Sequence, residues 1–319
     1  YTFIETSYLY STEYKRVFAF NISIEPIDDE NPSGNIFSWN VKTFGDYTDE
    51  PDWTSYNSCD GMLSDISFAI TEDGMGNIWS TDFYGVSKFD GTSWTTYTAD
   101  DGLYENYNWS ILTDSHGDVW FSGPSEGGVT VWDGNSFTII PVNGTFGECI
   151  YEDLAGNIWF GSYSGDGVAK YDGNSWVYYP ESLGNFGGSV FSISEDVHGN
   201  IYFAVSNGIV VYDGSAWFPF YIPNNSEPIS EIFFDSQGNT WFATFGNIYS
   251  KYDGTNWTNY TDPETHYITD ISEDITGGIW FANYYNEMVS YNGTTWADYI
   301  ISDGFAPGVS NLFAIFGDS

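Results

Sequence analysis

Acidic side chains are the main candidates for chemistry in this chain of 319 residues. Carboxylates can bind a cation or accept hydrogen bonds from sugar hydroxyls, and a close pair can serve glycoside hydrolysis. We place one candidate ligand or cation site near the rim of the predicted fold, before or within its inner strands. Its residues are Asp65, Glu105, Tyr107, Glu148, Glu231, His266 and Asp270. A catalytic carboxylate pair is disfavoured, because any acidic protein of this shape would offer such pairs.

Residues that usually accompany catalysis are scarce, with only six Lys and Arg and three His. His116 and His198 share one position in a repeated turn, so we expect them to face solvent. No Ser/His/Asp set and no His–Glu metal cluster can be formed from these positions. We therefore predict no catalytic residue, no enzyme and no cofactor. We expect the turn aspartates to cap their own hairpins. Calcium at these turns is the less favoured alternative, because no dense Asp-x-Asp-x-Asp loop occurs.

The formal net charge is −39, from 45 acidic and 6 basic residues. This charge excludes a nucleic-acid backbone or an anionic membrane as a natural partner. No run of about 18 apolar residues is present, so we predict no membrane insertion. The composition fits an extracellular, cell-surface or periplasmic protein, and Tyr1 resembles the start of a processed chain. Cys59 and Cys149 lie two repeats apart, which favours separate thiols over a disulfide.

A repeated motif determines how these residues are positioned. Its clearest copy reads Gly-Asn-Ile-Trp-Phe over 156–160 and Gly-Val-Ala-Lys-Tyr-Asp-Gly-Asn-Ser-Trp over 167–176. Each copy predicts four antiparallel strands, with an Asp turn after the first strand and an Asp-Gly or Asn-Gly turn after the third. The second strands are centred on Trp79, Trp120, Trp159, Tyr202, Trp241 and Trp280. A period near 40 residues with four strands per repeat is typical of an all-β β-propeller.

The two ends of the chain predict a seventh, composite blade. Residues 34–56 resemble strands two to four, and 309–318 resemble a first strand through Leu312, Phe313 and Ile315. Joining them would close a seven-bladed propeller over 34–319 and remove its open edges. Such closure would form hydrogen bonds between the chain ends.

Residues 1–33 do not follow the repeat, and we treat them as an N-terminal extended arm. Its alternating Phe18, Phe20, Ile22 and Ile24 predict a strand that has no slot once 309–318 completes the blade. If 16–25 completes the blade instead, 309–318 is surplus. A surplus strand can pair with a neighbouring molecule, and head-to-tail donation gives open filaments. The favoured function is therefore a structural or adhesive subunit whose partners are copies of itself.

Asparagine sequons suggest a glycoprotein, although several are expected by chance in a chain this rich in Asn, Ser and Thr. Asn108 falls in an expected inner strand. The other sequons are Asn21, Asn143, Asn224, Asn256, Asn259 and Asn292.

The repeat resembles the two-component regulator propeller family. The matching residues are Ile193-Ser-Glu-Asp-Val-His-Gly-Asn-Ile-Tyr-Phe and Gly208-Ile-Val-Val-Tyr-Asp-Gly, with equivalents across 34–318. The resemblance implies a propeller outside the cytoplasm that binds a ligand, commonly carbohydrate-related. It supports an alternative function as a monomeric glycan- or cation-binding sensor module. For that module we expect Tyr104, Tyr107, Trp109 and Tyr267 to lie on one rim, where they could stack on sugars.

Overall fold

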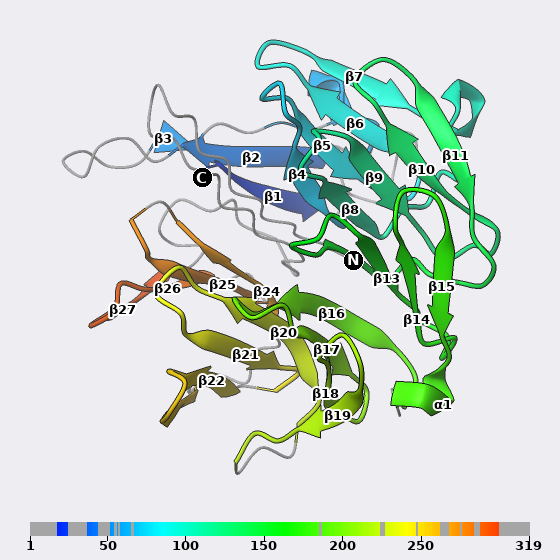
Figure 1. Cartoon of the computed structure of the whole chain (residues 1–319). Coiled ribbons are helices and arrows are strands. Elements are labelled where there is room, and N and C mark those ends of the chain that lie inside the picture. Colours follow the sequence, from blue (N-terminus) through cyan, green and yellow to red (C-terminus); the bar gives the residue numbers. More distant parts are fainter. Residues whose placement is uncertain are drawn as a thin grey trace, which may run out of the picture.

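The computed structural model describes most of the chain as β-structure arranged in a ring (Figure 1). The described residues are 18–24, 37–43, 52–53, 56, 58–64, 67–184, 187–223, 227–246, 248–261, 268–274, 276–283 and 288–299. Side chains are described for most of these, but not for 18–24, 37–43, 52–53 or a few positions flanking the gaps.

Six four-stranded antiparallel sheets form consecutive blades, as the repeat predicted. Blade 1 is β4 (Ile70–Glu72), β5 (Ile78–Thr81), β6 (Val86–Phe89) and β7 (Trp94–Tyr97); blade 2 is β8 (Ser110–Thr113), β9 (Val119–Ser122), β10 (Gly128–Trp132) and β11 (Phe137–Pro141). Blade 3 is β12 (Cys149–Glu152), β13 (Ile158–Gly161), β14 (Val168–Tyr171) and β15 (Trp176–Tyr179); blade 4 is β16 (Val190–Glu195), β17 (Ile201–Val205), β18 (Gly208–Tyr212) and β19 (Trp217–Phe220). Blade 5 is β20 (Ile229–Phe234), β21 (Thr240–Thr244), β22 (Ile248–Tyr252) and β23 (Trp257–Thr261); blade 6 is β24 (Ile268–Glu273), β25 (Ile279–Asn283), β26 (Met288–Tyr291) and β27 (Trp296–Tyr299).

Helical structure in the described residues is limited to short connections. They are η1 (Ser58–Asp60), η2 (Ala99–Asp101) and α1 (Glu181–Gly184). The first strands of neighbouring blades contact one another and lie nearest the middle of the ring, whereas fourth strands such as β11, β15 and β19 lie outside (Figure 1). No helix among the described residues is long and apolar enough to cross a membrane.

The prediction of seven four-stranded blades is wrong for the described part of the chain, which contains six. The expected seventh blade corresponds to a three-stranded sheet of β1 (Phe18–Ile24), β2 (Phe37–Thr43) and β3 (Asp52–Trp53). Its first strand comes from the segment that we assigned to an N-terminal arm, because that segment forms an unbroken antiparallel ladder with β2. The competing closure strand 309–318, with Leu312, Phe313 and Ile315, lies outside the described residues.

The pairing of β1 also bears on the expected self-assembly. Its ladder runs from Phe18 opposite Thr43 to Ile24 opposite Phe37, so every residue of β1 faces a partner in its own chain. The strand expected to pair with a neighbouring molecule is therefore used within the molecule. The filament-forming function has no support in this fold.

The hydrophobic core lies between blades rather than within one sheet. In several blades the tryptophan of the second strand packs against the next blade. The centroid of the Trp79 ring of blade 1 lies 5.5 Å from that of Phe121 and 5.6 Å from that of Trp132, both in blade 2. The Trp159 ring likewise lies 5.6 Å from Phe203 of blade 4. Each such cluster is shared by two adjacent blades, so no blade buries its faces alone.

Hydrogen bonds add to this packing at the ends of the first strands. The Glu152 carboxylate of blade 3 accepts bonds from the Ser115 N–H at 2.6 Å and from the Ser115 hydroxyl at 2.7 Å in blade 2. Glu273 of blade 6 binds Ser236 of blade 5 in the same way. These bonds connect adjacent blades where the sheets meet solvent.

Candidate functional site

The up-and-down strand order gives the ring two different faces. We call the end with the turns after first and third strands the turn face, and the end with the loops after second strands and the links between blades the loop face. Turn-face residues repeat from blade to blade, whereas the loops of the loop face differ in length and sequence. Variable loops on a rigid scaffold are the usual location of binding sites.

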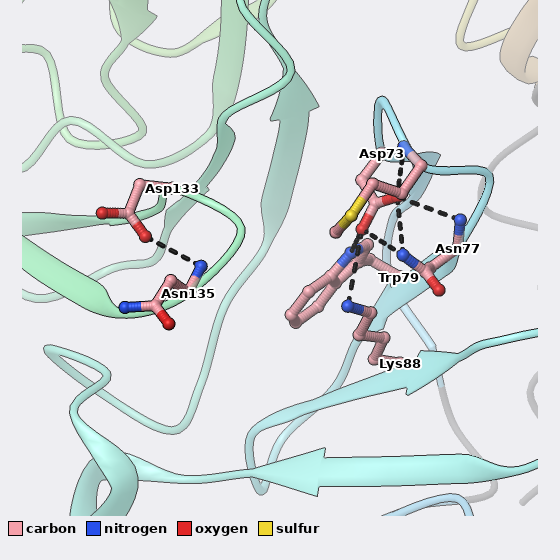
Figure 2. Close-up of polar contacts among 7 residues, drawn as sticks. Asp73, Asn77, Trp79, Lys88, Asp133 and Asn135 are labelled. Atoms are coloured by element: carbon pink, nitrogen blue, oxygen red, sulfur yellow. Dashed lines mark hydrogen bonds and ion pairs between the residues drawn. The ribbon is translucent and has the colours of Figure 1, made fainter.

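The aspartates of the turn face have a structural role. The Asp73 carboxylate accepts bonds from the backbone N–H groups of Met75 and Asn77 at 3.0 Å and from Trp79 Nε1 at 2.8 Å (Figure 2). The same tryptophan bond occurs at Asp114, Asp153, Asp235 and Asp274. The prediction that these aspartates cap their own hairpins is confirmed.

Lysines on third strands also belong to this structural layer. Lys88 Nζ lies 3.7 Å from Asp73 and above the rings of Trp79 and Trp132, at 5.1 and 5.6 Å from the ring centroids. Lys170 and Lys251 lie above Trp159 and Trp241. Lys88 therefore forms a local ion pair with Asp73, and the tryptophan faces are additional partners.

An arc of aromatic side chains crosses the loop face of blades 1 to 3. Successive ring centroids are 4.6 Å apart for Phe68–Phe83, 4.8 Å for Phe83–Tyr107, 5.5 Å for Tyr107–Trp109 and 5.2 Å for Trp109–Tyr163. Tyr84 lies next to Phe83, at 6.5 Å between ring centroids. Unlike the second-strand tryptophans, these rings keep exposed surface, which is 55% for Tyr163 and 61% for Tyr84. We call Phe68, Phe83, Tyr84, Tyr107, Trp109 and Tyr163 the aromatic arc.

Two aromatic residues of the arc and the candidate carboxylate Glu148 occupy the same position in their respective blades. The N–H groups of Phe68, Trp109 and Glu148 each donate to the last residue of the second strand in their blades. In blade 4 the equivalent residue is the bulged Phe191, between the paired residues Val190 and Ser192. Glu148 therefore stands between Trp109 and Phe191, at equivalent positions of adjacent first strands that contact each other.

The environment of Glu148 makes its carboxyl group unusual. Burial raises its pKa to about 7. No side chain among the described residues donates a hydrogen bond to it, and its residue keeps partial exposure. A carboxylate that is partly desolvated but unpaired can gain more from a cationic partner than a fully hydrated one.

Two other carboxylates, Glu231 and Asp270, come one residue after the position equivalent to Glu148 in their own blades. Glu231 follows the bulge of blade 5 and accepts a 2.6 Å bond from the Ser192 hydroxyl of blade 4. Asp270 is its equivalent in blade 6. Burial and then the charge of Asp270 raise the pKa of Glu231 well above its ordinary value. Burial, and then the charges of Glu148 and Glu231, also raise the pKa of the Cys149 thiol above its ordinary value.

Two more carboxylates lie at the loops of blades 1 and 2. Glu105, whose pKa burial raises, accepts bonds from the Ser125 N–H and hydroxyl. Asp82, which the sequence analysis missed, is buried, and this raises its pKa to about 7 although the N–H groups of Tyr84 and Gly85 donate to it. The structure therefore brings Glu231 close to Asp270 and places Glu148 and Glu231 near the Cys149 thiol. Glu105 lies beside the aromatic arc, two residues before Tyr107.

Several other predicted residues have different outcomes. Asp65, His266, Tyr267 and Asn224 lie outside the described residues, and the side chain of Asn21 is not described. Tyr104 is half-buried and donates to the Glu126 carbonyl oxygen. Asn108 is buried, whereas four sequon asparagines are exposed: Asn143, Asn256, Asn259 and Asn292.

The described residues contain no group of three or more His, Cys, Asp or Glu side chains arranged to hold a metal ion. Cys59 and Cys149 do not form a disulfide with each other in the structure. Four residues of the aromatic arc were not predicted from the sequence: Phe68, Phe83, Tyr84 and Tyr163. A usable signal was present, because Phe83, Tyr84 and Tyr163 occupy the loop that follows a second strand.

Comparisons with known proteins identify the fold. No protein-family model matches the chain, and no curated protein matches it. Virginiamycin B lyase from Staphylococcus aureus, solved with quinupristin, is 18% identical with a TM-score of 0.67, covering 78% of this chain and 88% of the lyase. An extracellular domain assigned to a hybrid two component system of B. thetaiotaomicron is 19% identical with a TM-score of 0.66. That match covers 99% of this chain but 48% of the domain. The TM-scores show that these proteins share the propeller fold with this chain. At identities below 20%, the similarity extends to the fold alone.

Proposed function

We propose that this chain is a non-enzymatic ligand-binding propeller of the sensor type, working outside the cytoplasm, and that its loop face binds a glycan. The observation that carries the proposal is the aromatic arc, in which partly exposed rings form a continuous surface over three blades. The electron-rich face of an aromatic ring attracts the C–H groups of a sugar ring, and Tyr and Trp add polar edges for hydroxyl groups.

The distribution of polar groups agrees with this function. Carboxylates near the arc, such as Glu105 and Glu148, can accept hydrogen bonds from sugar hydroxyls. The described histidines, His116 and His198, lie in turn-face hairpins, so neither can act as an acid or base beside the arc. The resemblance of the repeat motif to two-component regulator propellers supports a binding role, whereas the fold itself is shared with both a lyase and an extracellular sensor domain.

The experiment is a screen of oligosaccharides by calorimetry, with the wild-type protein beside Trp109→Ala and Tyr163→Ala. Because aromatic anchors dominate binding energies, we expect each variant to weaken binding by about tenfold or more. Tyr163→Ala is the cleaner variant, since a side chain 55% exposed contributes little to folding.

The matched control is Phe218→Ala, an aromatic residue 41% exposed on the outer strand β19 of blade 4. Its removal should leave binding unchanged. The proposal fails if no oligosaccharide binds, or if Phe218→Ala weakens binding as much as Tyr163→Ala does.

A further inference from the structure

We infer that the ligand of the loop face carries a protonated amine, as in an oligomer of an amino sugar, and that Glu148 receives it between Trp109 and Phe191. This inference rests on the proposed function and names the class of glycan. It depends on where the positive and negative groups lie among the described side chains.

Positive charge in the described side chains is confined to the turn-face side of the blades. Lys88, Lys170 and Lys251 lie above second-strand tryptophans, near the aspartate turns. His116 and His198 lie within those turns. In a chain of net charge −39, none of these described lysine and histidine side chains forms an ion pair with Glu148.

Negative groups of the two faces also differ in their hydrogen bonds. Turn-face aspartates such as Asp73 and Asp153 are satisfied by their own hairpins and a tryptophan. Glu148 has no such donor among the described residues, and neighbouring blades place an aromatic residue on either side of it. A carboxylate with an aromatic residue at the equivalent position of each neighbouring blade is suited to an ammonium group, which can form an ion pair with the carboxylate and cation–π contacts with the rings.

The extent of the surface favours an oligomer over a small ion. The arc continues from Trp109 to Phe68 without a gap between rings, and Phe191 contacts Phe245 at 4.8 Å on the other side of Glu148. Several sugar rings can lie along such a surface while an amine reaches Glu148. A lone metal ion is not favoured, since the described acidic groups do not gather as a metal site.

The test compares glucosamine oligomers with N-acetylglucosamine oligomers of equal length, which differ by charge on the amine. Calorimetry would be done near neutral pH, where both the glucosamine amines and the Glu148 carboxyl group, with its pKa of about 7, are partly charged. We expect the charged oligomer to bind the wild-type protein about tenfold or more tightly. Glu148→Gln should remove most of that preference, and Glu126→Gln, an exposed acid of the same face, should retain it.

The outcomes separate this inference from the proposed function. Equal binding of both oligomers with loss in Tyr163→Ala would overturn the inference and keep a glycan-binding face. Binding of neither oligomer, with other glycans bound, would likewise overturn it. Polylysine is included as a control: if it binds equally well and Tyr163→Ala has no effect, attraction is non-specific and the inference fails.

Discussion

Asp73 shows how a single side chain can complete a hairpin and fix a buried tryptophan. Burial alone would raise its pKa, but hydrogen bonds from Trp79 and Asn77 outweigh burial and hold that pKa below its ordinary value. The ionised form is therefore stabilised in the folded chain. Its stabilising contribution is present above the unfolded-state pKa and is lost as pH falls through the folded-state pKa.

Replacing Asp73 by Asn should destabilise the protein by about 1–3 kcal/mol at neutral pH, because the new amide turns a donor toward other donors. Urea unfolding of the variant measures this loss. The difference from wild type should shrink in acid, where Asp73 itself becomes protonated.

Asp133→Asn provides the control, since that carboxylate is exposed and accepts only local bonds from its own turn (Figure 2). It should cost clearly less stability than Asp73→Asn. An equal loss in the two variants would contradict the role assigned to the Asp73–Trp79 bond.

At the scale of elements, two glycines allow blades 2 and 3 to approach at the loop face. A Cβ added to Gly147 would lie 1.9 Å from the Gly123 carbonyl oxygen, which is backbone and cannot move aside cheaply. Gly147 directly precedes Glu148, the residue that we propose to receive an amine. The spacing of the two blades therefore also positions this part of the site.

Gly147→Ala should push the start of β12 away from blade 2, at a cost of about 1–3 kcal/mol, typical of overpacking. Ligand affinity should fall as well, because Glu148 moves relative to Trp109. Thermal unfolding and calorimetry on the same sample would measure both effects.

The matched substitution is Gly246→Ala in blade 5, where the nearest atom would be the flexible Glu227 side chain at 3.4 Å. This variant should be close to wild type in stability and binding. If Gly147→Ala behaved in the same way, the close approach would not govern the geometry of the site.

The sequence predicted those elements that depend on local signals. Turn residues such as Asp153 and Asp172 recur at fixed offsets from alternating apolar residues, so six blades and their strand order were predictable. The seventh was not, because 16–25 and 309–318 both carry a first-strand pattern. Which of two similar strands pairs with β2 depends on distant parts of the chain.

The site was predictable only in part, for a related reason. Glu148, Glu231 and Asp270 could be placed because they follow the repeat. The aromatic arc could not, since Phe83 and Tyr163 lie in loops of unequal length and contact residues of other loops or a neighbouring blade. Their contacts result from how blades are spaced, which no local pattern encodes.

At the scale of the whole molecule, buried carboxyl groups make stability depend on pH near neutrality. Burial raises the pKa values of Glu148 and Asp82 to about 7, and burial together with the charge of Asp270 raises the pKa of Glu231 well above its ordinary value. A folded-state pKa raised above the unfolded value gives stability that is present at low pH and lost as pH rises through the folded pKa. Self-repulsion from a net charge of −39 acts in the same direction.

We therefore expect the melting temperature to be higher at pH 5 than at pH 8, by at least about 3 °C, equivalent to roughly 1 kcal/mol for a protein of this size. Groups with lowered pKa, such as Asp73, stay ionised across this interval and do not oppose the trend. Glu148→Gln should raise stability at pH 8 and reduce the slope, while Glu126→Gln should not. A melting temperature that rises from pH 5 to pH 8 would contradict this account, because desolvated carboxyl groups must then be compensated by a cation bound within the ring.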